Sequence, residues 1–235
     1  MTSDTAWNVE ALRSSARTKG ANLDRVSELI NSIGRSAAIF RYHMATARDA
    51  LNGIVNDAEP QRQENFMLIL GMSEKHEEFA FAKLVGEANV IACLHTARNM
   101  WDMFAQLANA LILEKPISVG ACDIGRVLDA MPPSELETRL RILLDSHWYK
   151  YVAAFSNTAK HRRLVQHSMT VSIEENRIGF RIGAFSYGDK SFPAYWGHEV
   201  LEGAIEVKNG IIECGRLLNT VYIGEDANPG GAGGA

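Results

Sequence analysis

The longest run of helical periodicity in the chain extends from about Glu74 to Leu113. At ~1.5 Å per residue, an unbroken helix of this length would span close to 60 Å. Its weak point is Gly86, since glycine costs about 1 kcal/mol relative to alanine inside a helix, and we expect a helix that could be bent or split near Gly71 or Gly86. Apolar residues recur along it at intervals of three and four, which indicates one buried helix face. They include Phe79, Phe81, Leu84, Val85, Ala88, Ile91, Leu94, Trp101, Phe104, Leu107, Ala108 and Leu111.

The same periodicity predicts further helices on both sides of this segment. Pro60 and Pro116 separate some of them, and Ser134 followed by Glu137 forms a capping box that starts another. The predicted helices are Asn22 to Ile54 or Val55, Gln61–Leu70, Asp123–Ala130, Ser134–Phe155 and Gly197–Val221.

After His167 the period changes from about 3.6 to two. Met169, Val171 and Ile173 alternate with polar residues, and a second alternating run follows Glu174–Asn176, so we expect a β-hairpin at about 168–183. The stretch Phe185–Trp196 is a loop or a third strand. The predicted fold is therefore mainly α: a helical bundle of four long helices with a small β-hairpin inserted before the last helix.

Two strands are too few to fold alone, so we expect one domain over residues 21–223. Residues 1–20 are polar and weakly patterned, which predicts a flexible N-terminal arm with a short helix around Val9–Arg17. Residues 224–235 are rich in glycine and are expected to form a flexible tail.

The net charge of -4 excludes a global basic field of the kind that drives non-specific nucleic-acid binding. Cys93, Cys122 and Cys214 lie far apart without CxxC spacing, so we expect a cytoplasmic protein without a zinc or disulfide framework. The N-terminus does not resemble a secretory signal, and no window approaches ~20 apolar residues, so no membrane contact is expected. ExxH, HExxH, GxSxG and P-loop patterns are absent, and we expect neither a metal nor a cofactor.

The densest group of cations is the basic cluster, Lys160, His161, Arg162 and Arg163. If Asn157 or the following threonine caps a new helix, the basic cluster lies in a first turn, where backbone N–H groups and the helix dipole favour an anion. The alternative is that the basic cluster ends the preceding helix, where cations compensate the last carbonyl groups.

The long helix contributes a second polar group. His95, Arg98 and Asp102 are spaced at i, i+3 and i+7 and therefore share one face, with Asn99 beside them. In one interpretation Asp102 faces the bundle interior, where it pairs with Arg162 or orients His161. In the other, this is the solvated face of the helix.

The helical bundle, its polar helix face and the spacing from Arg162 to His167 resemble HEPN domains, the higher-eukaryote and prokaryote nucleotide-binding superfamily. Those domains are four-helix bundles and usually dimers. Many are metal-independent ribonucleases, and others bind nucleotides or partner proteins. The resemblance implies that Arg162 binds the scissile phosphate and that His167 or His161 acts as general acid or base. Phe155–Arg162 also resembles a motif of uncharacterised bacterial helical proteins with a His–Asp pair on an earlier helix, as His95 and Asp102 are here.

Three hypotheses about function follow. The first is a HEPN-like homodimer that binds RNA or a nucleotide, or that cleaves RNA without a metal. The second is a non-enzymatic helical interaction protein, in which Asp102 or Glu87 pairs with the basic cluster at a structural corner. The third is a small-molecule or metal enzyme of another type. The ribonuclease hypothesis requires Arg162, His161 and His167 to line one open cleft with the face that carries His95.

Overall fold

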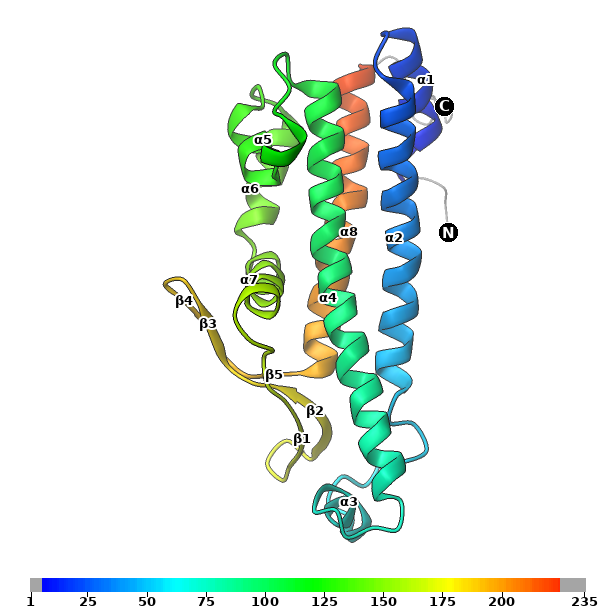
Figure 1. Ribbon diagram of the computed structural model, residues 1–235, viewed down its shortest axis with the longest axis vertical. Coiled ribbons are helices and arrows are strands. Elements are labelled where there is room, and N and C mark those ends of the chain that lie inside the picture. Colours follow the sequence, from blue (N-terminus) through cyan, green and yellow to red (C-terminus); the bar gives the residue numbers. More distant parts are fainter. Residues whose placement is uncertain (1–5, 225–235) are drawn as a thin grey trace, which may run out of the picture. The chain divides into compact units, whose positions relative to one another are not determined.

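The computed structural model of the protein describes residues 6–224 and confirms a mainly α fold with a small set of antiparallel strands before the last helix (Figure 1). A 3₁₀ turn, η2, covers Val119–Ala121. From residue 225 on, the predicted tail lies outside the described residues. The helices are α1 (Val9–Thr18), α2 (Leu23–Asp49), α3 (Gln63–Ile69), α4 (His76–Ile112), α5 (Ile124–Ala130), α6 (Glu135–Asp145), α7 (His147–His161) and α8 (Gly197–Ile223). The strands are β1 (His167–Ser172), β2 (Arg177–Ile182), β3 (Phe185–Tyr187), β4 (Lys190–Phe192) and β5 (Tyr195–Trp196).

The chain divides into two compact units. Of the described residues, the first unit contains 6–37, 97–150 and 206–224, and the second contains 38–96 and 151–205. Helices α2, α4, α7 and α8 contribute residues to both. None of the helices between residues 6 and 224 combines the length and the apolar character that crossing a membrane requires.

The first unit is built on tryptophans that contact neighbouring helices. Trp7, just before α1, packs edge-on against Phe104 of α4, and its indole N–H donates to the side chain of Asn219 on α8 at 3.0 Å. Trp101 of α4 donates to the carbonyl group of Val207 on α8 at 3.1 Å. The helix predicted around Val9–Arg17 is thus confirmed as α1, and it is joined to α4 and α8 through Trp7.

The helix predicted from Ser134 to Phe155 is two helices, and the prediction of one continuous helix was wrong. Ser134 does cap α6, accepting from the Glu137 N–H at 3.1 Å. Ser146 then ends α6 with an extended backbone, and its hydroxyl donates to the Leu143 carbonyl group at 2.7 Å. The same hydroxyl accepts from the Tyr149 N–H at 3.4 Å, so one serine side chain ends α6 and begins α7.

In the second unit, β1 and β2 form the predicted hairpin, and β5 pairs with β2 to complete a three-stranded antiparallel sheet. The hairpin turn contains Asn176, whose positive φ of 47° is tolerated by asparagine better than by most residues. On the inner face of the hairpin, Met169 and Ile178 pack with Leu68 of α3 and Phe79 of α4 in a buried cluster.

Helix α4 continues through Gly86 as a single helix, and another side chain occupies the space beside this glycine. A Cβ at Gly86 would lie 2.2 Å from Cζ of Phe180 on β2, so any larger residue would collide with the ring. The predicted break near Gly71 falls instead in the connection before α4, where Gly71 has a φ of 70°.

The stretch predicted as a loop or third strand contains β3, β4 and β5. β3 and β4 pair with each other, and aromatic side chains hold them to α7. Tyr151 of α7 contacts Phe185, Phe192 and Tyr195 edge-on at centroid distances of 5.4–5.5 Å. The β3–β4 hairpin, which lies between β2 and β5 in the chain, is thereby fixed to α7.

Candidate functional site

The basic cluster lies at a helix C-terminus. α7 continues through Asn157, which is half-buried inside it, and Lys160 and His161 form its last turn. The backbone N–H groups of Arg162 and Arg163 both donate to the carbonyl group of Thr158 at 3.0 Å. The new helix that would have offered backbone donors to an anion does not form, and the second of the two predicted alternatives is confirmed.

The two residues that the HEPN resemblance singles out differ in accessibility. Arg162 is exposed, and its guanidinium group lies over the ring of Tyr187 at 4.7 Å from the centroid. The side chain of His167 is only 2% exposed, because it begins β1 and packs edge-on against Phe155. His167 therefore does not line an open cleft with Arg162, whereas His161, the other candidate acid or base, is exposed at the end of α7.

His167 is held in a defined orientation. Its Nδ1 lies 3.0 Å from the Val165 carbonyl group and 3.5 Å from a carboxylate oxygen of Glu87 on α4. Nδ1 therefore carries the proton in the neutral ring, and Nε2 is buried without a hydrogen-bond partner among the described residues. Burial lowers the imidazole pKa, while the Val165 carbonyl group and the Glu87 carboxylate act in the opposite direction.

His95 pairs with a residue that the sequence did not single out. Its Nδ1 lies 2.7 Å from the hydroxyl group of Ser156 on α7. Burial and, after it, the positive charge of Lys160 lower the His95 pKa, which favours the neutral ring. Ser156 is fully buried, so its hydroxyl group orients the imidazole and is out of reach of a substrate in solution.

Asp102 does not face a bundle interior. Its side chain is 45% exposed and accepts a 2.5 Å hydrogen bond from Arg98 one turn earlier on α4. The interpretation that placed it inside the bundle is therefore wrong, and its partner is a neighbour on the same helix. Among residues 6–224, no three His, Cys, Asp or Glu side chains gather closely enough to hold a metal ion.

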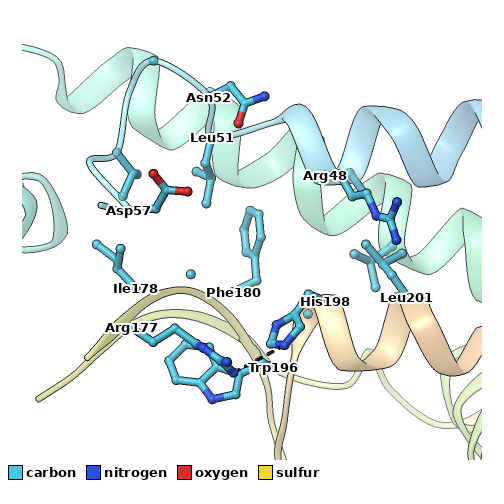
Figure 2. A pocket seen from close by; sticks show the side chains of 16 residues that line it. Arg48, Leu51, Asn52, Asp57, Arg177, Ile178, Phe180, Trp196, His198 and Leu201 are labelled. Atoms are coloured by element: carbon cyan, nitrogen blue, oxygen red, sulfur yellow. Dashed lines mark hydrogen bonds between the residues drawn. The ribbon is translucent and has the colours of Figure 1, made fainter. Parts of the chain in front are cut away.

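A cavity of about 390 Å³ lies within the second unit, where α2, α4, β2, β5 and α8 meet; we call it the α8 pocket (Figure 2). Its ionisable side chains are Arg48, Asp57, Arg177 and His198. Residues 48 and 198 are 150 positions apart in the chain, so no local motif reveals the site. The α8 pocket is lined by Ala47, Arg48, Leu51, Asn52, Gly53, Val55, Asp57, Val90, Arg177, Ile178, Gly179, Phe180, Trp196, Gly197, His198 and Leu201.

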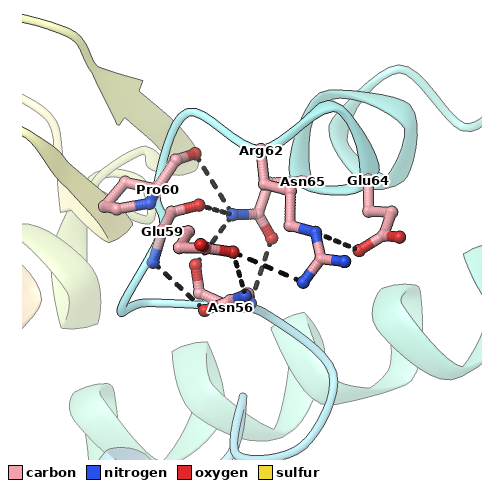
Figure 3. Close-up of polar contacts among 6 residues, drawn as sticks. All are labelled: Asn56, Glu59, Pro60, Arg62, Glu64 and Asn65. Atoms are coloured by element: carbon pink, nitrogen blue, oxygen red, sulfur yellow. Dashed lines mark hydrogen bonds and ion pairs between the residues drawn. The ribbon is translucent and has the colours of Figure 1, made fainter.

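The loop between α2 and α3 forms one wall of the α8 pocket, and Asn65 at the start of α3 shapes it (Figure 3). The Asn65 side chain is buried and donates to the carbonyl groups of Asn56, Glu59 and Pro60 at 2.8–3.1 Å. Its carbonyl oxygen accepts from the Asn56 N–H at 3.0 Å. These contacts satisfy backbone groups that the irregular loop leaves unpaired, and they fix the segment that carries Asp57.

The opposite wall is cationic. Arg177 Nη1 lies 3.4 Å from His198 Nε2, and because arginine can only donate, Nε2 accepts and the His198 proton is on Nδ1. The Arg177 guanidinium group also lies over the Trp196 ring, 5.4 Å from its centroid. Glu175 pairs with Arg177 at 3.9 Å, so part of this positive charge is compensated.

The N-terminus of α8 opens on the same wall. The side chain of Glu199 accepts from the backbone N–H of Trp196 at 2.7 Å. The Trp196 indole can only donate, so its side chain cannot accept from the N–H groups of the first turn. Gly197 and His198, the first residues of α8, line the α8 pocket. The positive end of the helix dipole adds to the charge of Arg48 and Arg177, and the carboxylate of Glu199 in the first turn offsets part of it.

Comparison of the chain with family models, with curated proteins and with solved structures found no match.

Proposed function

We propose that the protein is a non-enzymatic binding protein and that the α8 pocket takes a small organic molecule. The observation that carries this proposal is a cavity of about 390 Å³ with an apolar interior and charged groups from α2, a loop, β2 and α8. Small-molecule sites typically have volumes of about 300–1,000 Å³ and combine apolar walls with a few polar groups that orient the ligand.

The test is a fragment screen on the ¹⁵N-labelled protein. The Trp196 indole and the Gly179 and Gly197 amides line the α8 pocket and serve as reporters. We expect a subset of fragments to shift these signals together, and Asn52→Trp, a substitution at an exposed lining position, to block the shifts. The proposal fails if no fragment moves the reporters, or if the shifts persist unchanged in the blocked variant.

A second candidate function is HEPN-like RNA or nucleotide binding through the basic cluster. It is favoured by four adjacent exposed side chains, Lys160 to Arg163, with Tyr187 beneath Arg162. Clustered cations bind phosphates, and an adjacent aromatic ring offers a stacking surface for a base. The burial of His167 supports the binding form of the HEPN family over the ribonuclease form. In the competing interpretation, the basic cluster serves only as a structural corner, held by the contact of Arg162 with Tyr187.

Labelled RNA incubated with the purified protein in EDTA distinguishes these alternatives. RNA binding that Arg162→Ala weakens, without cleavage, supports the binding function. Cleavage that both Arg162→Ala and His167→Ala abolish would instead establish the ribonuclease. If RNA is neither bound nor cleaved, the basic cluster is a structural corner.

We also propose that the protein is a cytoplasmic homodimer. Phe81 and Leu84 on α4 are 68% and 61% exposed and lie one turn apart, which supports an apolar contact along this helix. Light scattering coupled to size exclusion tests it: we expect a dimer that Phe81→Glu converts to a monomer. A monomeric wild-type protein at micromolar concentration would overturn this part of the proposal.

A further inference from the structure

The α8 pocket carries charges of opposite sign on its two sides. In Figure 2 the Asp57 carboxylate and the Arg48 guanidinium group lie on opposite sides of the Phe180 ring, with the guanidinium group directed toward Leu201 and His198 on the same side of the ring as Arg48. Both charged side chains are exposed. This arrangement bears on the ligand that the α8 pocket can accept, and the inference drawn from it rests on the proposed binding function.

Neither Asp57 nor Arg48 has a side-chain hydrogen bond or an ion pair with any other residue between 6 and 224. The other charged groups of the α8 pocket are partly compensated, since Arg177 contacts Glu175, His198 and the Trp196 ring. Asp57 and Arg48 therefore keep their capacity to bind a ligand charge, and the fold supplies no competing partner for either.

The Arg48 side favours an acidic group. The guanidinium group is a planar fork that matches a carboxylate, and the first turn of α8 begins at Gly197 and His198 on the same side of the pocket. The carboxylate of Glu199 offsets part of the positive helix dipole there. The Nδ1–H of His198 is a further donor, since its Nε2 already accepts from Arg177. A carboxylate on this side would meet donors from α2 and from α8.

The Asp57 side favours a cation. A second acidic group would be repelled by the carboxylate, whereas an ammonium group would be attracted to it. Leu51 and Phe180 lie between the two charges, and Ile178 adds apolar lining on the Asp57 side. An aliphatic or aromatic segment of the ligand would bury its surface there.

We infer that the α8 pocket binds a small zwitterion in which an apolar segment separates an ammonium group from a carboxylate. The ammonium group faces Asp57 on the loop after α2, and the carboxylate faces Arg48 and the N-terminus of α8. An ω-amino carboxylate and a short apolar peptide with free termini both have this chemistry.

Calorimetric titration with ε-aminocaproate, caproate and hexylamine tests the inference, because these probes share an apolar chain and differ in their charged ends. We expect ε-aminocaproate to bind at least about fivefold more tightly than either singly charged probe, the factor for about 1 kcal/mol from one added charge pair. Raising the ionic strength should reduce the difference, since the ends of the ligand remain partly solvated.

Two substitutions test which residue binds which charged end of the ligand. Asp57→Asn should weaken binding of ε-aminocaproate and hexylamine about fivefold and leave caproate unchanged. Arg48→Gln should weaken ε-aminocaproate and caproate and leave hexylamine unchanged. Arg41→Gln, which changes an exposed arginine two turns earlier on α2 and outside the α8 pocket, is the matched control and should change nothing. Unaltered thermal melting of the variants would show that they fold.

The possible failures are distinguishable. If all three probes bind equally and the substitutions have no effect, the α8 pocket binds small molecules but the charge assignment is overturned. If caproate alone binds, the ligand is a simple anion, and the role of Asp57 is refuted. If no probe binds and no fragment shifts the signal of the Trp196 indole, the proposed function itself is refuted.

Discussion

The basic cluster and the α8 pocket both concentrate positive charge, but they do so in opposite ways. In the basic cluster, Lys160 to Arg163 are adjacent in sequence and end exposed at the C-terminus of α7, where Arg162 lies over Tyr187. In the α8 pocket, Arg48 and Arg177 come from α2 and β2 and line one cavity. The cations of the basic cluster are neighbours in the chain, whereas those of the α8 pocket are far apart in the chain and line the same cavity.

This difference has a physical reason. Consecutive residues at the end of a helix point in different directions, about 100° apart, so four neighbours cannot aim at one point. Residues from separate elements can converge, because the fold sets their directions independently. The comparison predicts that substitutions in the supporting fold damage the α8 pocket and leave the basic cluster intact.

The largest expected effect comes from Asn65→Ala. The substitution removes three donated hydrogen bonds and one accepted bond, and it leaves backbone groups of the loop after α2 unpaired. We expect the free energy of unfolding in urea to fall by about 2–3 kcal/mol. Ligand affinity of the α8 pocket should fall with it, because the loop carries Asp57.

Asn52→Ala is the matched control for stability. Asn52 is exposed, and its side chain donates only to Asp49, at 3.0 Å, so the expected loss is below about 0.5 kcal/mol. An equal loss in the two variants would show that the loop is held by something other than Asn65.

A smaller effect is expected for Gly86→Ala. The new methyl group would lie 2.2 Å from Cζ of Phe180 and push the ring towards the α8 pocket that it lines. We expect a loss of about 1–3 kcal/mol in the free energy of unfolding, together with weaker ligand binding.

Gly34→Ala on α2 provides the contrast, because a Cβ there meets nothing within 4 Å. The helix propensity of alanine should then raise stability by up to about 1 kcal/mol. Two glycine-to-alanine changes in helices would thus have opposite signs. A stabilising Gly86→Ala would mean that Phe180 does not lie against α4.

Features encoded by local patterns could be predicted from the sequence. The alternation around Met169 and Ile178 predicted the hairpin, and the Ser134–Glu137 spacing predicted the start of α6. Both depend on residues that are neighbours in the chain. The end of α6 did not follow in this way, because Ser146 stops it through contacts with Leu143 and Tyr149 in a segment whose apolar period continues unbroken.

The α8 pocket could not be predicted, for a related reason. Arg48 and His198 meet only through the tertiary fold, and neither carries a local signal of function. The burial of His167 was missed because its spacing from Arg162 suggested a shared site, whereas the strand that begins at His167 turns it inward. The sequence predicts a weak point of α4 at Gly86, but it does not show that the ring of Phe180 packs into the space beside this glycine.

Lowering the pH should destabilise the second unit through its two part-buried histidines. Burial lowers the pKa of His167, and burial together with Lys160 lowers that of His95, from the ordinary value of 6.5. Below that value the unfolded chain takes up protons that the folded chain resists. Stability is therefore full above about pH 6.5 and is lost as the pH falls towards the folded pKa values.

Urea unfolding at a series of pH values measures this slope. His167→Asn keeps a donor for the Val165 carbonyl group but does not titrate, so it should flatten the dependence. His76→Asn, at the exposed start of α4, should leave the slope as it is. A slope that survives both in His167→Asn and in His95→Asn would assign the acid sensitivity to other groups.

The smallest expected effect lies in the basic cluster itself. The contact between Arg162 and the ring of Tyr187 is exposed, so Arg162→Ala should lower the free energy of unfolding by only about 0.5–1 kcal/mol. Tyr187→Leu should cost a similar amount, and the double variant should cost less than the sum, because the two changes remove the same contact. Binding of ε-aminocaproate should be the same in all three variants. A large change in that binding would mean that the basic cluster and the α8 pocket are energetically coupled, and that their positive charges act together on one ligand.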